Sequence, residues 1–275
     1  MSDVWSSNFI DQSPLFDPLK LAYSKDRLTN NNWPTIAELN QYVANHKPTI
    51  KNHNQQSIQL IEQTCKSQEF AYGYEPSIYL RGELLTRANN WHDFFNMLVW
   101  LSFPKIKAAI NYWQYNLLKL RWPAQPNRTP LENKLTHLDE NGVIVVSCNQ
   151  PLIELLKAQR WQELFWQQRA TVQTQMQFFI IGHALYEKAL NPYVGMTGSA
   201  VIFEQSEAFF TLPLAQKLGE IDRLMGQCLY EQEWLAALTK LAPVPILGVP
   251  GWWPANEHYS FYENKSYFRD KRAEK

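Results

Sequence analysis

Apolar residues recur at three- and four-residue steps from Val172 to Leu190, VQTQMQFFIIGHALYEKAL. This spacing predicts an α-helix, and a second apolar stripe beside the first predicts one that is buried on most sides. Gly182 lowers helix stability by about 1 kcal/mol relative to alanine, so we expect it to permit close approach of another element. His183 shares a helical face with Glu187. We expect another part of the chain to meet this pair, because each unmet buried polar group costs about 1–3 kcal/mol.

A second dense apolar stretch begins at Trp91. Asn89 or Asn90 can cap a helix there, and Asp93 would lie in its first turn, where the helix dipole favours an acid. Pro104 must end this helix and can open the next one. The apolar side chains of that next helix share one face, so the opposite face is expected to point into water, with Lys105, Lys107, Asn111 and Lys119.

Shorter patterns predict the remaining elements. Further helices are expected at 36–46, 151–158, 161–168 and 214–225. Strands are expected at 58–60, 143–146 and 200–203, with two more within 77–86 that turn at Arg81-Gly82. Residues 121–136 contain three prolines and predict a loop, and residues 139–142 have the composition of a turn.

These elements predict an α+β fold: a mainly α-helical single domain with a small β-sheet and an irregular aromatic-rich C-terminal segment. Residues 1–32 are polar and predict an irregular N-terminal arm. Residues 33–269 are expected to form a single globular domain, and residues 270–275 a frayed tail. The prolines and aromatic residues between 247 and 269 predict a segment that packs over the body of the domain without regular structure.

Composition narrows the class of protein. Lys plus Arg equals Asp plus Glu at 26 each in 275 residues, so net charge gives no argument for a nucleic-acid or membrane partner. Three widely spaced cysteines suit a reducing compartment better than a disulfide framework. The first residues show no signal-peptide pattern, and the longest apolar run is too short to span a bilayer. We therefore expect a soluble cytoplasmic protein without a membrane partner.

The aromatic content is high, at 11 Trp, 13 Tyr and 14 Phe. Aromatic side chains bury much area per residue, so a well-packed core accounts for them. A surface that stacks on bases, with Arg121 and Arg128 nearby, is the alternative and would bind nucleic acid. Neither GxGxxG nor GxxxxGK[ST] occurs, which disfavours nucleotide-binding folds that depend on glycine-rich loops.

Four segments together resemble an uncharacterised bacterial family, domain of unknown function 3025. The resemblance lies in TRANNWHDFFNMLVWLSFPKIKAAIN (86–111), LTHLDENG (135–142), GHALYEKAL (182–190), and LGVPGWWPAN with FYENKSYFR (247–269). It implies a grouping and no activity. In the family an Arg-Asp pair precedes the LT of the second segment. Here Glu132-Asn133-Lys134 stands there, so any chemical task of that Asp is in doubt.

The polar residues of these segments are the candidates for chemistry. If the predicted helices pack on one another, a set of candidate catalytic residues could converge: His92, Asp93, Asp139, Glu140, His183 and Glu187. They suit acid–base catalysis by a histidine that a carboxylate orients. They also suit a divalent metal such as zinc, manganese or iron, with candidate ligands His92, His183, Glu187 and Asp139. Candidate substrate-binding residues are Arg87, Asn96, Trp252 and Trp253.

Each candidate also has a structural interpretation. Asp93 suits an N-terminal helix acid, Asp139 and Glu140 suit turn residues, and Arg87 suits an ion pair with Glu83 or Asp93. Two functions therefore remain open. One is a hydrolase-like or metal-dependent enzyme that acts on a small polar substrate beneath the aromatic C-terminal segment. The other is a non-enzymatic protein that binds nucleic acid or protein through an aromatic and basic surface.

Convergence of the two histidines and the carboxylates in one pocket would favour the enzyme. Dispersal of these groups as separate caps and ion pairs would favour the binding protein.

Overall fold

The structure is a computed structural model that describes residues 4–25, 28, 32–63, 69–125, 127–238 and 241–271. The expectations for Cys65, for part of the N-terminal arm and for residues 272–275 of the tail lie outside these ranges. The helices are α1 (Ile36–Ala44), α2 (Tyr74–Arg81), α3 (Trp91–Ser102), α4 (Pro104–Arg121), α5 (Pro130–Asn141), α6 (Gln150–Lys157), α7 (Arg169–Gln175), α8 (His183–Ala189), α9 (Glu207–Thr211), α10 (Leu214–Cys228) and α11 (Gln232–Ala237). The strands are β1 (Gln59–Glu62), β2 (Glu83–Thr86), β3 (Gly142–Ser147), β4 (Met176–Ile180), β5 (Thr197–Glu204) and β6 (Ala242–Pro245).

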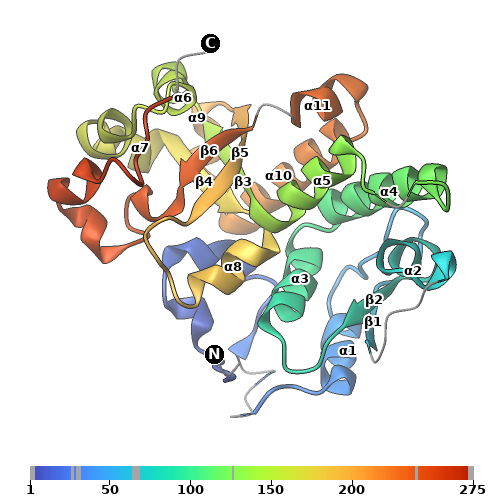
Figure 1. Ribbon diagram of the computed structural model, residues 1–275. Coiled ribbons are helices and arrows are strands. Elements are labelled where there is room, and N and C mark those ends of the chain that lie inside the picture. Colours follow the sequence, from blue (N-terminus) through green and yellow to red (C-terminus); the bar gives the residue numbers. More distant parts are fainter. Residues whose placement is uncertain are drawn as a thin grey trace.

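Two small sheets lie on opposite sides of α3 (Figure 1). The larger sheet has the strand order β4-β3-β5-β6, with β3 parallel to β5 and the two outer pairings antiparallel. β3 has the sequence GVIVVS, and all six of its residues are buried, as expected for a strand covered on both faces. The smaller sheet pairs β1 with β2 in parallel and packs against α1 and α2. The predicted mainly helical α+β class is confirmed.

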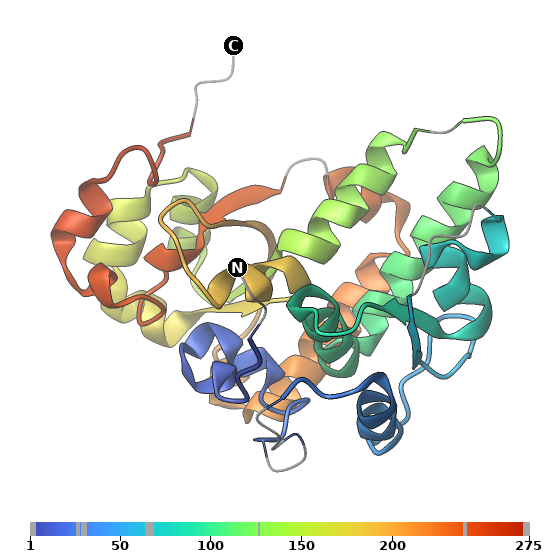
Figure 2. The same cartoon turned by 60° about the horizontal axis from the view of Figure 1, so that its bottom comes forward.

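Helices α3 and α4 lie between the two sheets (Figure 1). α3 packs against α8, while α4 packs against both α10 and α2. Figure 2 shows the same arrangement from below, with α3 near the centre of the molecule. The buried Asp222 side chain on α10 accepts hydrogen bonds from the backbone N–H groups of Lys105 and Ile106, at 3.0–3.1 Å, and so caps the first turn of α4.

The prediction of one helix from Val172 to Leu190 is wrong. The segment forms α7, then β4, then α8. β4 pairs with β3 from Val143–Ile180 to Ser147–Met176, and four of its five residues are buried. A continuous apolar run of this length suits a buried strand as well as a buried helix, and periodicity cannot separate the two.

Helix ends explain two further wrong predictions. The first half of 77–86 is the end of α2, and Gly82, at φ +72°, is its left-handed C-cap rather than a hairpin turn. Residues 130–141 form α5 instead of a loop and a turn. Thr129 and Glu132 form a capping box and Pro130 takes the first helical position, so the proline begins a helix here.

The face of α4 that was expected to point into water is also partly buried. Lys107 and Asn111 are both buried, and with Gln114 they form a polar stripe at helical spacing. α4 contacts α2 and α5 along its length, so these side chains lie against neighbouring helices.

The N-terminal residues and the C-terminal segment complete the core. Phe9 and Phe16 are fully buried, and the Phe16 ring stacks on that of Tyr186 with centroids 5.8 Å apart. At the other end of the chain, residues 246–263 form 3-10 turns, and Tyr262 and Phe268 are fully buried. Most of the aromatic content therefore serves the core.

We expect Gly182→Ala to lower the free energy of unfolding by about 1–3 kcal/mol, because a Cβ there would lie 2.5 Å from the Glu140 oxygen and the Gly142 nitrogen. Denaturant unfolding measures the change. Gly219→Ala is the matched control: it lies inside α10, and a Cβ there meets nothing within 4 Å. The control should gain about 0.5–1 kcal/mol. Equal tolerance of the two substitutions would contradict the close contact at Gly182.

Candidate functional site

The ends of three helices bring the two histidines together. Asn90 caps α3 by accepting from the Asp93 backbone N–H at 3.0 Å, which puts His92 in the first turn. His183 is the first residue of α8 and follows Gly182. The close approach of Gly182 to Glu140 and Gly142 holds the start of α8 against the end of α5, which carries Asp139 and Glu140. Figure 1 shows α3, α5 and α8 meeting near the centre of the molecule.

His92 and His183 face each other directly. Their Nε2 atoms are 3.0 Å apart, and the ring planes meet at 73°. The Nδ1 atom of His92 lies 3.0 Å from Glu187 Oε2, and the Nδ1 atom of His183 lies 3.6 Å from Asp139 Oδ2. The four side chains therefore form a row with two imidazoles in the middle and a carboxylate at each end, which we call the histidine row.

The buried end of the histidine row holds a charge pair. Lys107 Nζ lies 2.5 Å from Asp139 Oδ1, and only 5% of the lysine side chain is exposed. Burial alone would raise the pKa of Asp139, but the Lys107 ammonium beside it outweighs burial and holds that pKa below its usual value. Burial lowers the pKa of His183 to about 3, and the Asp139 carboxylate offsets only part of this effect. His183 is therefore neutral at neutral pH.

The hydrogen-bond acceptors around the histidine row determine which ring nitrogens carry a hydrogen. The Glu187 carboxylate accepts from His92 Nδ1, so the Nε2 atom of a neutral His92 carries a lone pair. The Nε2–H group of neutral His183 faces that lone pair at 3.0 Å. In this assignment His183 carries no hydrogen on Nδ1. His92 accepts a hydrogen bond while His183 presents an N–H group.

Arg87 and Asp93 form the rim beside His92. The Asp93 carboxylate accepts from the Arg87 backbone N–H at 2.7 Å and from its guanidinium at 3.0 and 2.9 Å. Glu83, the other partner considered for Arg87, instead pairs with Arg81. Half of the Arg87 side chain remains exposed, so it can still meet an anionic group.

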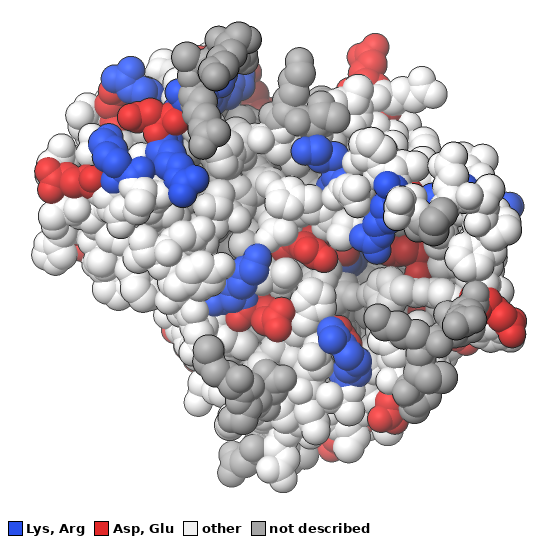
Figure 3. Space-filling model, viewed as in Figure 1, with Lys and Arg blue, Asp and Glu red and all other residues white. Residues whose placement is uncertain are grey.

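A pocket of about 340 Å³ opens in front of the two histidines. Six of the candidates from the sequence line it: Arg87, His92, Asp93, Asp139, Glu140 and His183. On the face seen in Figure 3, acidic and basic side chains gather around a hollow near the centre of the molecule. The lining is strongly polar, which suits a small polar substrate better than an apolar one.

Four other candidates do not line this pocket. Glu187 lies behind His92 and orients it, and Asn96 donates to the hydroxyl of Tyr74 at 2.6 Å. Trp252 lines a different pocket, and Trp253 packs against the hydrophobic core. The structure therefore gives no support to the expected aromatic cover over the histidines.

Sequence reasoning missed Lys107, Glu75 and Tyr74. Glu75 and Tyr74 line the pocket at the start of α2, and burial raises the pKa of Glu75 to about 7 although Asn111 donates to its carboxylate at 2.7 Å. The spacing of Lys107, Asn111 and Gln114 on one helical face was a visible signal, because three polar residues at that spacing can line a buried seam. No pattern in the sequence indicated Glu75.

The geometry gives limited support to the predicted divalent metal site. Within the described ranges, no group of three or more His, Cys, Asp or Glu side chains is arranged to hold a metal ion. The Nε2 atoms of His92 and His183 bond to each other, Glu187 bonds to the far side of His92, and Asp139 bonds to Lys107. In this arrangement the two histidines and the two carboxylates can hold and transfer protons.

The basic residues proposed for nucleic acid are engaged elsewhere. The Arg121 guanidinium bonds to the buried carboxylate of Glu132 at 2.9 and 3.1 Å. Arg128 donates to the Thr136 hydroxyl at 2.9 Å and lies at the rim of the histidine pocket. Since one of the two is committed to an internal ion pair, the pair does not form a basic surface for phosphates.

We expect Glu75→Gln to stabilise the protein at pH 8 by about 1–2 kcal/mol more than at pH 4.5. A Glu whose folded-state pKa is raised from 4.5 to about 7 loses stability as pH rises between those values, because the unfolded chain ionises first. Glutamine removes this loss. Urea unfolding at the two pH values measures the effect, with Glu154→Gln on the exposed face of α6 as the control. Equal differences for both variants would contradict the burial of Glu75.

Comparisons with known proteins give a grouping. The family model described as "Protein of unknown function (DUF3025)" matches residues 58–272, which covers α2–α8, both sheets and the histidine row. No curated protein and no solved structure matches the chain. Among the described residues, no helix is long and apolar enough to cross a membrane. The chain belongs to the DUF3025 family.

Proposed function

We propose that this protein is a hydrolase-like enzyme that uses acid–base catalysis by His92 and His183 on a small polar substrate. The observation that carries the proposal is the 3.0 Å contact between the two Nε2 atoms, with a carboxylate behind each ring. His92 donates from Nδ1 to the Glu187 carboxylate and so has its lone pair at Nε2, which is the arrangement of a general base.

The roles of the two histidines differ because their surroundings differ. His92 is 29% exposed at its side chain and lines the pocket, so it can exchange protons with a substrate or water. His183 is buried and stays neutral, so its Nε2–H group can donate a hydrogen bond without delivering a full charge. A reacting group that replaces the contact between the two Nε2 atoms would meet a base at His92 and a donor at His183.

The remaining pocket residues bind and orient in this proposal. Arg87 and Arg128 at the rim can bind an anionic part of the substrate. Glu75, with its pKa raised to about 7 by burial, is partly protonated at neutral pH and can share a proton with the reacting group. Lys107 holds Asp139 ionised behind His183. We propose the metal-free mechanism because no third ligand side chain joins the two histidines within the described ranges.

A cytoplasmic location forms part of the proposal. Cys148 and Cys228 are both free thiols, which suits a reducing compartment. The binding alternative receives less support, because most of the aromatic side chains are buried in the core and Arg121 is paired internally.

We expect His92→Gln to lower turnover at least 100-fold while the melting temperature changes little, since His92 is only partly buried. Wild-type protein is first screened against small esters, amides, and phosphate mono- and diesters. The variant is then assayed on the substrates that react. His258→Gln, at an exposed position outside the pocket, is the control and should keep full activity.

Unchanged turnover in a folded His92→Gln protein would contradict the proposal. Activity that a chelator abolishes and one divalent metal restores would replace the metal-free mechanism with the metal-dependent one.

A further inference from the structure

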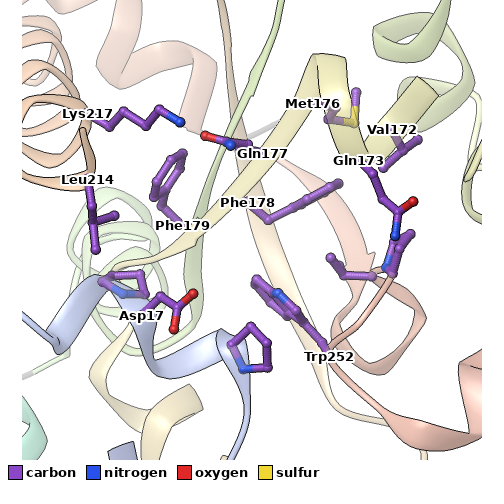
Figure 4. A pocket seen from close by; sticks show the side chains of 14 residues that line it. Asp17, Val172, Gln173, Met176, Gln177, Phe178, Phe179, Leu214, Lys217 and Trp252 are labelled. Carbon is purple, nitrogen blue, oxygen red and sulfur yellow. The ribbon is translucent and has the colours of Figure 1, made fainter. Parts of the chain in front are cut away.

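A second pocket, of about 280 Å³, lies among residues 14–18, β4, α10 and residues 249–252 (Figure 4). It shares no lining residue with the histidine pocket. Its walls come from both ends of the chain and from the larger sheet, so it is fixed by the tertiary fold and not by one loop. We call it the Lys217 pocket.

The larger part of the Lys217 pocket is apolar. Phe178 and Trp252 meet edge to face, with ring centroids 6.2 Å apart and planes at 74°, and Met176 lies beside them on β4. Figure 4 shows both rings directed toward the centre of the pocket. Such a wall suits a flat or compact apolar group of a ligand.

Lys217 supplies a buried cation at one end. It is 92% buried, and its ammonium donates to the Phe210 carbonyl at 2.9 Å. That bond caps the last turn of α9 and uses one of the three N–H groups of the ammonium. Among the described residues Lys217 forms no ion pair, although its ammonium also lies over the Phe209 ring, 5.9 Å from the centroid, and burial lowers its pKa. Buried charges in proteins are usually paired, so this ammonium can bind an anionic partner.

Gln177 supplies an unmet acceptor at the same end. Its side-chain oxygen Oε1 is buried and has no hydrogen-bond partner among the described residues. In Figure 4 the ends of the Lys217 and Gln177 side chains point toward one another at the same end of the pocket. A ligand group placed there needs an acceptor for Lys217 and a donor for Gln177.

Asp17 lies at another part of the pocket wall and does not cancel the cation. Its carboxylate pairs with the Lys20 ammonium at 2.6 Å, three residues along the chain. In Figure 4 Asp17 lies below Lys217, with Leu214 and Phe179 between them. The unpaired charge of the pocket is therefore positive.

We propose that the Lys217 pocket binds a small apolar carboxylic acid that carries a hydroxyl or amino group next to its carboxylate. The carboxylate accepts from the Lys217 ammonium, and the neighbouring hydroxyl or amino group donates to Gln177 Oε1. Gln177 and Phe178 face opposite sides of β4, which is an outer strand of the sheet, so the apolar part of the acid passes the free edge of β4 to lie against Phe178 and Trp252. The volume of about 280 Å³ restricts the ligand to a small molecule.

Three matched probes test the proposal by calorimetric titration of the full chain. 3-Phenyllactate has both polar groups, 3-phenylpropanoate lacks the hydroxyl, and 2-phenylethanol lacks the carboxylate. We expect 3-phenyllactate to bind most tightly, 3-phenylpropanoate several-fold more weakly, and 2-phenylethanol at least 10-fold more weakly. These differences reflect the hydrogen bond to Gln177 and the ion pair with Lys217.

Two variants separate the roles of the polar residues. In Gln177→Leu, the hydroxyl should no longer matter, so the two acids should bind equally while both still exceed the alcohol. In Lys217→Met, which keeps the length of the side chain, the acids should lose at least 10-fold in affinity. His92→Gln lies in the other pocket and should leave all three affinities unchanged.

The proposal is overturned if the wild-type protein binds none of the probes, or if the alcohol binds as tightly as the acids. It is also overturned if a folded Lys217→Met protein keeps the wild-type affinity for 3-phenyllactate. Should Lys217→Met fail to fold, the probe series on the wild type and the Gln177→Leu variant still decide the matter.

Discussion

The contact between Gly182 and the backbone at Glu140–Gly142 is the constraint on which the candidate site depends. The N–H groups of Ile181 and Gly182 both donate to the Gly142 carbonyl at 3.0 Å, and there is no room for a side chain at position 182. This contact fixes the first residue of α8, His183, against the last turn of α5. The packing of α3 on α8 then brings in His92. Four side chains from three helices thus form one row because two backbones touch.

The charged side chains around the histidine row are neutralised by ion pairs. Lys107 and Asp139 are held together inside the protein, and Arg87 is held by Asp93 at the rim. Buried ion pairs contribute little net stability, because desolvation offsets most of their attraction. The desolvation cost of the Lys107–Asp139 and Arg87–Asp93 pairs is explained if these pairs fix a neutral His183 beside an accessible His92. The aromatic core around Phe9, Phe16 and Tyr186 supplies the apolar burial that lets the fold carry these polar groups.

The sequence predicted the fold class, α3, the Pro104 break, and the approximate positions of β1, β3 and β5. It failed where local pattern and tertiary pairing disagree. Met176–Ile180 is apolar enough for either a helix or a strand, and only its pairing with β3 decides the outcome. Most candidate residues were identified from the polar residues of the segments that carry the family resemblance, yet Lys107 and Glu75 were missed. The spacing of Lys107 with Asn111 and Gln114 was a signal of a polar seam, but which helices pack against α4 depends on tertiary structure, and no local pattern indicated Glu75.

The most direct test of the account is a nuclear magnetic resonance titration of the histidine rings in protein labelled with nitrogen-15 at histidine. The His183 signals are assigned by their loss in His183→Gln. The account predicts that His183 stays neutral from pH 8 down to about pH 4.5, with its proton on Nε2, because burial lowers its pKa to about 3. A His183 ring that titrates near its ordinary pKa of about 6.5, or carries its neutral-state proton on Nδ1, would contradict the histidine row and the roles assigned to it.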